Sequence, residues 1–374
     1  MIYLDNAATT PPDRDAVRQA ADLLEKGFFN PSALYKEGFE AHKRLEEARK
    51  SILSHIAASS LYELIFTASG SEADNQALFS YATVRGNIII TAGEHAAVYN
   101  TAKELERRGV EVRTAPLNAD GSVNIDSLLH LADANTGFVS VIHVNNETGA
   151  INDIEKLAGE VKKISPRAVF HSDGVQAFGK LPGKLPRNID LYSISAHKIG
   201  GIRGAGALVR KKGVKLFPLI FGGEQENGLR SGTENTFAIQ QFCYAADAKF
   251  ASLEKDYLFV KELNAIVRDR LDSDLFEIIS SKEASPYILS VAATGLRGEV
   301  LLHMLDDAGV IVGTGSACSS KNRFSRTILA CGLNEKKAEG VLRISFSPKN
   351  TREEVVEAVR IINRSAQNLS AKMR

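Results

Sequence analysis

A histidine and a lysine follow one of the apolar runs of the sequence. Ser195-Ala-His197-Lys198 stands where a β-rich run ends and a glycine-rich stretch begins. A lysine held at the end of a strand in a dry pocket is partly neutral, so its amine can form a Schiff base. Most lysines are instead solvated at the surface, and this segment alone does not decide between the two interpretations.

A carboxylate follows another apolar run. Asp173, in Asp173-Gly-Val-Gln176, comes directly after residues 168–172 and is expected at the same edge of a sheet. An aspartate paired with the pyridinium nitrogen of pyridoxal phosphate (PLP) keeps that nitrogen protonated, which makes the ring an electron sink for a carbanion at the substrate Cα. An aspartate after a strand is more often a turn or N-cap residue.

Further polar side chains follow other β-rich runs. Ser69-Gly70-Ser71-Glu72 lies between a strand and a helix, where backbone N–H groups can hold a phosphate, although Gly-Ser before a helix is common. Burying many polar groups is costly without a polar ligand, so we expect a ligand site where they gather. The groups expected at this one edge are His95, Asn146, Asp173, Gln176, His197 and Lys198.

Alternating β-rich runs and amphipathic helices, between about residues 60 and 210, must position these groups. This alternation predicts an α/β fold with a mostly parallel sheet and ligands at the carboxyl ends of its strands. After about residue 250, a charged helical stretch, a strand and a last helix predict a second, smaller α/β layer. We expect strands at 64–68, 87–91, 138–144, 168–172, 190–195, 205–210 and 287–292, and helices at 72–84, 98–108, 154–164 and 351–369.

The composition is typical of a globular protein that acts on small molecules. Lys and Arg total 46 against 45 for Asp and Glu, and this balance gives no electrostatic footprint for nucleic acid or an anionic membrane. No basic segment followed by an apolar one opens the chain, so we expect a cytoplasmic location, and no membrane span is visible. The three cysteines, Cys243, Cys318 and Cys331, match neither a zinc site nor a disulfide framework.

Taken together, these motifs resemble the cysteine desulfurases of NifS or IscS type, within the class V aminotransferase-like PLP enzymes. The resemblance spans nearly the whole chain. It implies the PLP-dependent transferase fold of type I, as in aspartate aminotransferase, with a large PLP-binding domain (15–250), a small domain (1–14 and 251–374) and a homodimer. The matching segments are 3–10, 30–32, 66–75, 94–95, 143–149, 197–198, 230–233, 315–318 and 342–346.

The resemblance implies a role for each residue of the cluster. Lys198 forms the Schiff base with pyridoxal 5'-phosphate, His95 stacks on the ring and shuttles protons, and Asp173 pairs with the ring nitrogen. The remaining residues hold the cofactor or the substrate: Asn146 and Gln176 near the phenolic oxygen, Gly70, Ser71, Ser195 and His197 at the phosphate with the partner subunit's Thr233, and Arg343 and Asn30 at the substrate carboxylate.

Cys318 matches the persulfide-forming cysteine and lies in a stretch of small residues, 312–322. Such a stretch suits a thiolate that attacks the substrate sulfur and then presents the persulfide to an acceptor. Cys243 and Cys331 are interpreted as core residues. The implied reaction turns L-cysteine into L-alanine and passes sulfur to a protein acceptor, such as an iron–sulfur scaffold or a tRNA-thiolation protein.

Several positions depart from the family pattern. Tyr35 stands where the family has histidine, and Ser71 stands where it has threonine. The loop after Cys318 is basic in place of a more acidic, proline-containing stretch; its residues are Lys321, Asn322, Arg323 and Arg326. These changes spare the core chemistry and bear on the substrate entrance and the sulfur acceptor.

Two alternative functions stay open at this point. A selenocysteine lyase, or another aminotransferase-like enzyme of class V, would keep Lys198 and Asp173 but would not need a mobile Cys318. A catalytically idle scaffold that binds sulfur-assembly partners would need none of the three. Bound PLP separates the scaffold from the enzymes, and a persulfide on Cys318 separates the desulfurase from the lyase.

Overall fold

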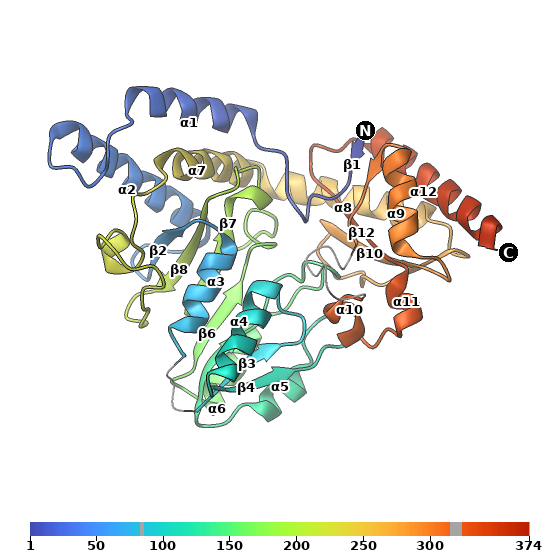
Figure 1. Cartoon of the computed structure of the whole chain (residues 1–374), viewed down its shortest axis with the longest axis horizontal. Coiled ribbons are helices and arrows are strands. Elements are labelled where there is room, and N and C mark those ends of the chain that lie inside the picture. Colours follow the sequence, from blue (N-terminus) through green and yellow to red (C-terminus); the bar gives the residue numbers. More distant parts are fainter. Residues whose placement is uncertain (83–85, 315–323, 374) are drawn as a thin grey trace.

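The computed structural model describes residues 1–82, 86–314 and 324–373 (Figure 1). Its larger part is built on a seven-stranded sheet of order β2-β8-β7-β6-β5-β3-β4. Only β8 runs against its neighbours, so the prediction of a mostly parallel sheet is confirmed. The strands are β2 (Tyr62–Thr67), β3 (Asn87–Thr91), β4 (Glu111–Ala115), β5 (Thr136–Ser140), β6 (Val169–Asp173), β7 (Leu191–Ser195) and β8 (Gly206–Lys211).

Helices cover both faces of this sheet, which is why central strands such as β3 and β7 are buried along their whole length. One face packs against α3 and α4, and the other against α2, α5, α6 and α7. The bounds are α2 (Lys36–Ile56), α3 (Gly70–Phe79), α4 (Ala96–Arg107), α5 (Ile125–Leu131), α6 (Ile154–Ile164) and α7 (Thr236–Ala251), with α1 (Arg14–Lys26) packed along α7.

A second, smaller layer follows along the chain. It holds an antiparallel sheet of order β12-β10-β9, with a hydrophobic core of its own against α8, α9 and α12. The division into domains at residues 15 and 250 stays a prediction. The elements are β9 (Phe276–Ile278), β10 (Ile288–Ala293), β12 (Val341–Ser345), α8 (Leu253–Arg270), α9 (Gly298–Asp307) and α12 (Arg352–Met373), with short helices α10 (Arg326–Ala330) and α11 (Glu335–Glu339).

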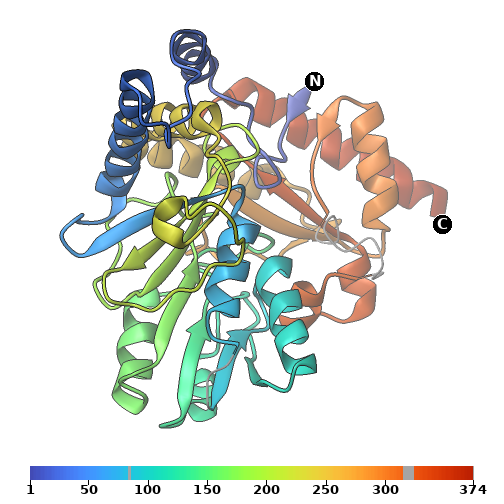
Figure 2. The same cartoon turned by 60° about the vertical axis from the view of Figure 1, so that its left-hand side comes forward.

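The N-terminal segment connects the two layers (Figure 2). Its strand β1 (Ile2–Tyr3) pairs in parallel with β11 (Val310–Ile311), and Leu4 lies in the core of the smaller layer. A few residues later, Thr10 N donates to the carbonyl of His197, just after the end of β7. Among the described residues, no helix is both long and apolar enough to span a bilayer.

Candidate active site

The carboxyl ends of five strands meet at one edge of the large sheet. β2, β3, β5, β6 and β7 all point the same way, because β8 alone is antiparallel. Each strand therefore delivers the polar residues that follow it to the same place. The predicted site residues that lie at this edge are Gly70, Ser71, His95, Asn146, Asp173, Gln176, Ser195, His197 and Lys198.

Asp173 and His95 lie close together in this edge. One oxygen of Asp173 accepts from the N–H of Val175 at 2.9 Å, and the side chain is 4% exposed. His95 Nδ1 accepts from the N–H of Ala97 at 3.1 Å, so the proton of the neutral ring sits on Nε2. Burial raises the pKa of Asp173 and lowers that of His95, while the positive charge of Lys198 favours the ionised Asp173.

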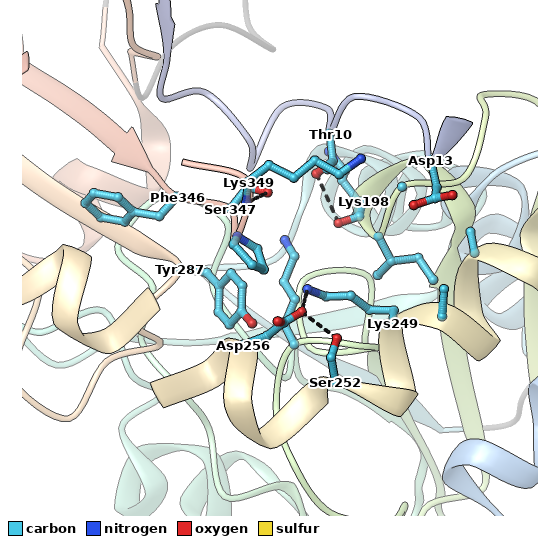
Figure 3. Close-up of a pocket in the computed structure, with 16 residues that line it drawn as sticks. Thr10, Asp13, Lys198, Lys249, Ser252, Asp256, Tyr287, Phe346, Ser347 and Lys349 are labelled. Atoms are coloured by element: carbon cyan, nitrogen blue, oxygen red, sulfur yellow. Dashed lines mark hydrogen bonds and ion pairs between the residues drawn. The ribbon is translucent and has the colours of Figure 1, made fainter. Parts of the chain in front are cut away.

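Lys198 ends the short 3₁₀ helix η1 (Ala196–Lys198) that follows β7. Its Nζ donates to the carbonyl oxygens of Ala7 and Ala8 at 2.8 and 2.7 Å. Thr10 Oγ1 donates to the lysine's own carbonyl at 3.2 Å (Figure 3). The N-terminal segment therefore holds both the main chain and the amine of this lysine.

A cavity of about 210 Å³ opens beside Lys198, between the end of α7, the start of α8 and the loop before α12 (Figure 3). Lys249 and Asp256 form an ion pair of 2.7 Å in its wall. Lys198 is the one predicted site residue among the described residues that line it.

Gln176 is held by a lysine that the sequence motifs did not reveal. Gln176 Nε2 donates to the carbonyl of Ala7 at 2.8 Å, and its Oε1 accepts from Lys180 Nζ at 2.7 Å. Lys180 is buried, and burial with the nearby positive charge of Lys198 lowers its pKa well below the ordinary value. In the sequence, only the four-residue spacing from Gln176 indicates that Lys180 lies near the site.

The start of α3 forms a cradle for an anion. Ser69 caps the helix by accepting from the N–H of Glu72 at 3.1 Å, which leaves backbone N–H groups of the first turn directed outward. A side chain at Gly70 would lie 2.6 Å from Val175, so only glycine lets the neighbouring loop approach this closely. Beside it, Ser195 Oγ is buried and has no hydrogen-bond partner among the described residues. Burial also lowers the pKa of His197 to about 4, so its ring is neutral.

Arg343, on β12, reaches this edge from the smaller layer. Its Nη1 donates to the carbonyl of Asn146 at 2.8 Å, and its Nη2 donates to Asp5 Oδ1 at 2.8 Å. Its Nε is buried without a partner among the described residues. The guanidinium is therefore fixed in orientation and keeps one donor for a ligand. Asp5, which the sequence reasoning did not single out, is the residue that fixes it.

Two predicted residues lie elsewhere in the single chain. Asn30 is exposed in the loop between α1 and α2, a loop that Figure 1 shows at the opposite end of the molecule from β12, and its side chain accepts from Ser32 N at 2.9 Å. Thr233 is exposed and lines a second cavity of about 210 Å³ together with Arg230 and the end of β2. The roles of Asn30 and Thr233 stay predictions.

Cys318 lies outside the described residues, but the segments on either side of it reach the site. On one side, Gly313 exchanges two backbone hydrogen bonds with Arg343, of 2.9 and 2.8 Å. On the other side, Ser325 donates to the carboxyl of Glu147, and Arg326 donates to the carbonyls of Ala92 and Glu94.

The two other cysteines, Cys243 and Cys331, are buried. Burial raises the pKa of each to about 12, so both thiols stay protonated at neutral pH. A protonated thiol is a poor nucleophile. These two cysteines are therefore unsuited to attack a substrate sulfur.

Comparisons with known proteins agree with this arrangement. Residues 2–358 match the Aminotransferase class-V family. A NifS/IcsS protein homolog of Lactobacillus delbrueckii is 36% identical over 99% of this chain and 98% of its own, and the cysteine desulfurase IscS of Dictyoglomus turgidum is 33% identical over 98% and 95%. A solved NifS-like protein superposes with a TM-score of 0.91 at 32% identity, over 98% of this chain and all of its own. The chain belongs to the aminotransferase class-V family, in the group of the cysteine desulfurases.

Proposed function

We propose that this cysteine desulfurase uses pyridoxal 5'-phosphate to move sulfur from free L-cysteine to Cys318 and releases L-alanine. The observation that carries the proposal is the sheet edge that brings Asp173, His95 and Lys198 together with Ser195 and Arg343, each of which has a donor without a partner among the described residues. An acidic group, a neutral imidazole and a lysine, with two spare donors for anions, match an anionic cofactor and an amino-acid substrate.

The residues present fit this cofactor. The first turn of α3 and Ser195 Oγ supply donors for a phosphate, and Gly70 leaves room for it. Asp173 supplies the carboxylate for the ring nitrogen, and Lys198 supplies the amine that would hold the cofactor covalently. The bound cofactor would withdraw electrons from the substrate Cα.

The protein's own groups bind the substrate and move its protons. Arg343 would take the cysteine carboxylate through its Nε, which has no partner in the described part of the chain, with its orientation held by Asp5 and Asn146. Lys198 Nζ would remove the Cα proton. His95 Nε2, which carries the proton of the neutral ring, would donate where a proton is needed later.

Sulfur transfer then falls to Cys318. Its thiolate attacks the sulfur of the bound cysteine, the Cβ–S bond breaks, and an S–S bond forms. The electron pair of the broken bond stays with the three-carbon fragment, which takes up a proton and leaves as alanine. The resulting persulfide passes by thiol exchange to a protein acceptor, for which iron–sulfur assembly and tRNA thiolation are the two expected pathways.

A homodimer in the cytoplasm is part of the proposal. Large apolar side chains are exposed on two segments at the same end of the molecule, next to α2 and β8 (Figure 1): Phe28, Leu34 and Phe39 on one, and Phe217 and Phe221 on the other. Such a surface supports contact with a second copy. In that dimer the partner subunit's Thr233 would join the phosphate site.

Two measurements test the function. Purified protein should absorb in the near-visible range, because the cofactor bound to Lys198 is coloured. After exposure to L-cysteine, mass spectrometry should find one added sulfur atom on Cys318 and none on Cys243 or Cys331. Alanine release without a sulfur adduct on Cys318 would favour a lyase instead, and a colourless protein that releases no alanine would favour a scaffold.

A further inference from the structure

A second carboxyl group lies beneath Asp173. Asp74 is on α3, which packs against β6, β7 and β8, and its side chain is 1% exposed. A carboxylate oxygen of Asp74, a ring nitrogen of His95 and a carboxylate oxygen of Asp173 all lie within 4.8 Å of one another. Asp74 Oδ1 has no hydrogen-bond partner among the described residues. No role for Asp74 follows from the motifs or from the proposed reaction.

Asp74 ends a chain of buried polar groups that crosses the sheet. Ser140 Oγ lies 3.3 Å from Glu94 Oε2 and 2.9 Å from His171 Nδ1. The other ring nitrogen, His171 Nε2, lies 3.0 Å from Ser193 Oγ and 3.6 Å from Asp74 Oδ1. The ring of His171 is therefore held from both sides, and this series of polar groups ends at Asp74, which lies next to Asp173.

The charges of this cluster cannot all be present together. His171 and Asp74 are close enough for an ion pair, but burial lowers the pKa of His171 to about 3, so the ring is neutral and cannot neutralise Asp74. Burial, and then the charge of Asp173, raise the pKa of Asp74 well above its ordinary range. Two buried carboxyls this close share one negative charge, as in other carboxyl pairs.

We infer that Asp74 is a positioning residue: it stays protonated, and thereby leaves Asp173 as the single anion of the pair, facing the ring nitrogen of the cofactor. The inference rests on the role proposed for Asp173. A neutral Asp74 adds no negative charge beside Asp173, whereas an ionised one would repel the charge of Asp173. The titratable groups that face Asp74 are Asp173 and His171 from β6, and His95 and Glu94 from the turn after β3.

Three variants test this, each compared in the cofactor-loaded form. Asp74→Ala removes the carboxyl group and should lower kcat by about tenfold or more, with little change in KM for cysteine. Asp74→Asn keeps the shape and an N–H donor but cannot ionise, so it should restore kcat to within about threefold of the parent. Without substrate, the near-visible absorption of the parent should have a pH-dependent component that comes from the ionisation of Asp74, and this component should be missing in Asp74→Asn. The matched control Glu94→Gln should keep it.

The outcomes separate the inference from the proposed function. If Asp74→Asn loses tenfold or more in kcat while the apo protein melts like the parent, or if it keeps that pH-dependent component of the absorption, the inference is wrong. It is also wrong if Glu94→Gln, and not Asp74→Asn, removes that component. Asp173→Asn is measured alongside: a large loss of kcat with cofactor still bound keeps the proposed role of Asp173, and unchanged kinetics would overturn both claims. The pH titration of Asp74→Asn decides the matter even where Asp74→Ala does not fold.

Discussion

The edge of the large sheet and the connection from the smaller layer hold their functional groups in different ways. At the edge, Asp173 ends a buried strand, and Lys198 follows the next one by three residues. From the smaller layer, Arg343 on β12 and Arg326 on α10 donate to backbone carbonyls in the loops of the large sheet. Groups of the first kind are placed by the fold itself. Groups of the second kind are placed by long side chains, so a single substitution can displace them without unfolding either core.

The largest expected effect is at the sheet edge. Lys198→Ala should reduce alanine release by about 10³-fold or more and abolish the near-visible absorption, because the amine is required for chemistry. Lys349→Ala, at the rim of the neighbouring cavity, is the matched control and should keep both signals. Circular dichroism should show both variants folded. Parent-like turnover in Lys198→Ala would remove this lysine from the mechanism.

The second prediction concerns the segment between the two regions. Cys318→Ser should still bind L-cysteine, since Lys198 and Arg343 are intact, but its sulfur transfer should fall by about 10²-fold or more, because a serine hydroxyl neither ionises near neutral pH nor holds a persulfide. Cys243→Ser and Cys331→Ser are the controls. Loss of transfer in either control, with its fold intact, would contradict the assignment of Cys318.

The third prediction tests Arg343, whose side chain extends from the smaller layer to the edge of the large sheet. Arg343→Lys keeps the positive charge but loses the planar fork, so KM for cysteine should rise by about tenfold or more while kcat changes less. Arg297→Lys, at an exposed position, should leave both constants unchanged. A large fall in kcat at unchanged KM would show that Arg343 acts on the reaction step and not on substrate binding.

The smallest effect is a pH dependence of stability at the sheet edge. Burial raises the pKa of Glu94 from about 4.5 to about 8. The folded protein thus binds this proton more tightly than the unfolded chain does, and the bound proton contributes to the free energy of unfolding. This contribution to stability is complete below about pH 4.5 and is lost as the pH rises through 8, and the loss is a few kcal/mol at most. Glu94→Gln should flatten the decline of the apo protein's Tm over this window. An equally steep decline in the variant would assign it to other groups.

Local patterns predicted each strand of the large sheet except β4 (Glu111–Ala115), and they predicted the positions of the strands better than their exact ends. The bounds expected for β3 and α6 match the structure, because β3 is a short apolar run and α6 has regular amphipathic spacing and is capped by Asp153. The strand expected at 138–144 ends instead at Ser140, yet Val141 and His143 still donate to carbonyls of β6 and its end. After Ser140 the chain continues in the same direction, but its backbone hydrogen bonds no longer follow the regular pattern of a parallel strand. The alternation of apolar and polar residues does not reveal where this pattern ends.

The direction of β8 was not predicted, although the ten residues between β7 and β8 are too few for a helical crossover. Within the site, the sequence motifs named the residues that would touch the cofactor. They did not reveal Asp5 or Asp74, whose partners lie far away in the chain, or Lys180, although its partner Gln176 is only four residues away. A buried polar residue on a helix or loop has the same local signature as an exposed one, so only the fold identifies it.

The contacts of the N-terminal segment affect the order in which the protein folds. Asn6 Nδ2 donates to the carbonyl of Ser345, 339 residues away, and the carbonyl of Ala7 accepts from Lys198. During synthesis the first ten residues emerge long before these partners exist. Contacts of such high sequence separation form late, after the loop between them has closed. The reactive lysine therefore gains its final surroundings only when the last strand is in place, so an incomplete chain cannot assemble a working site.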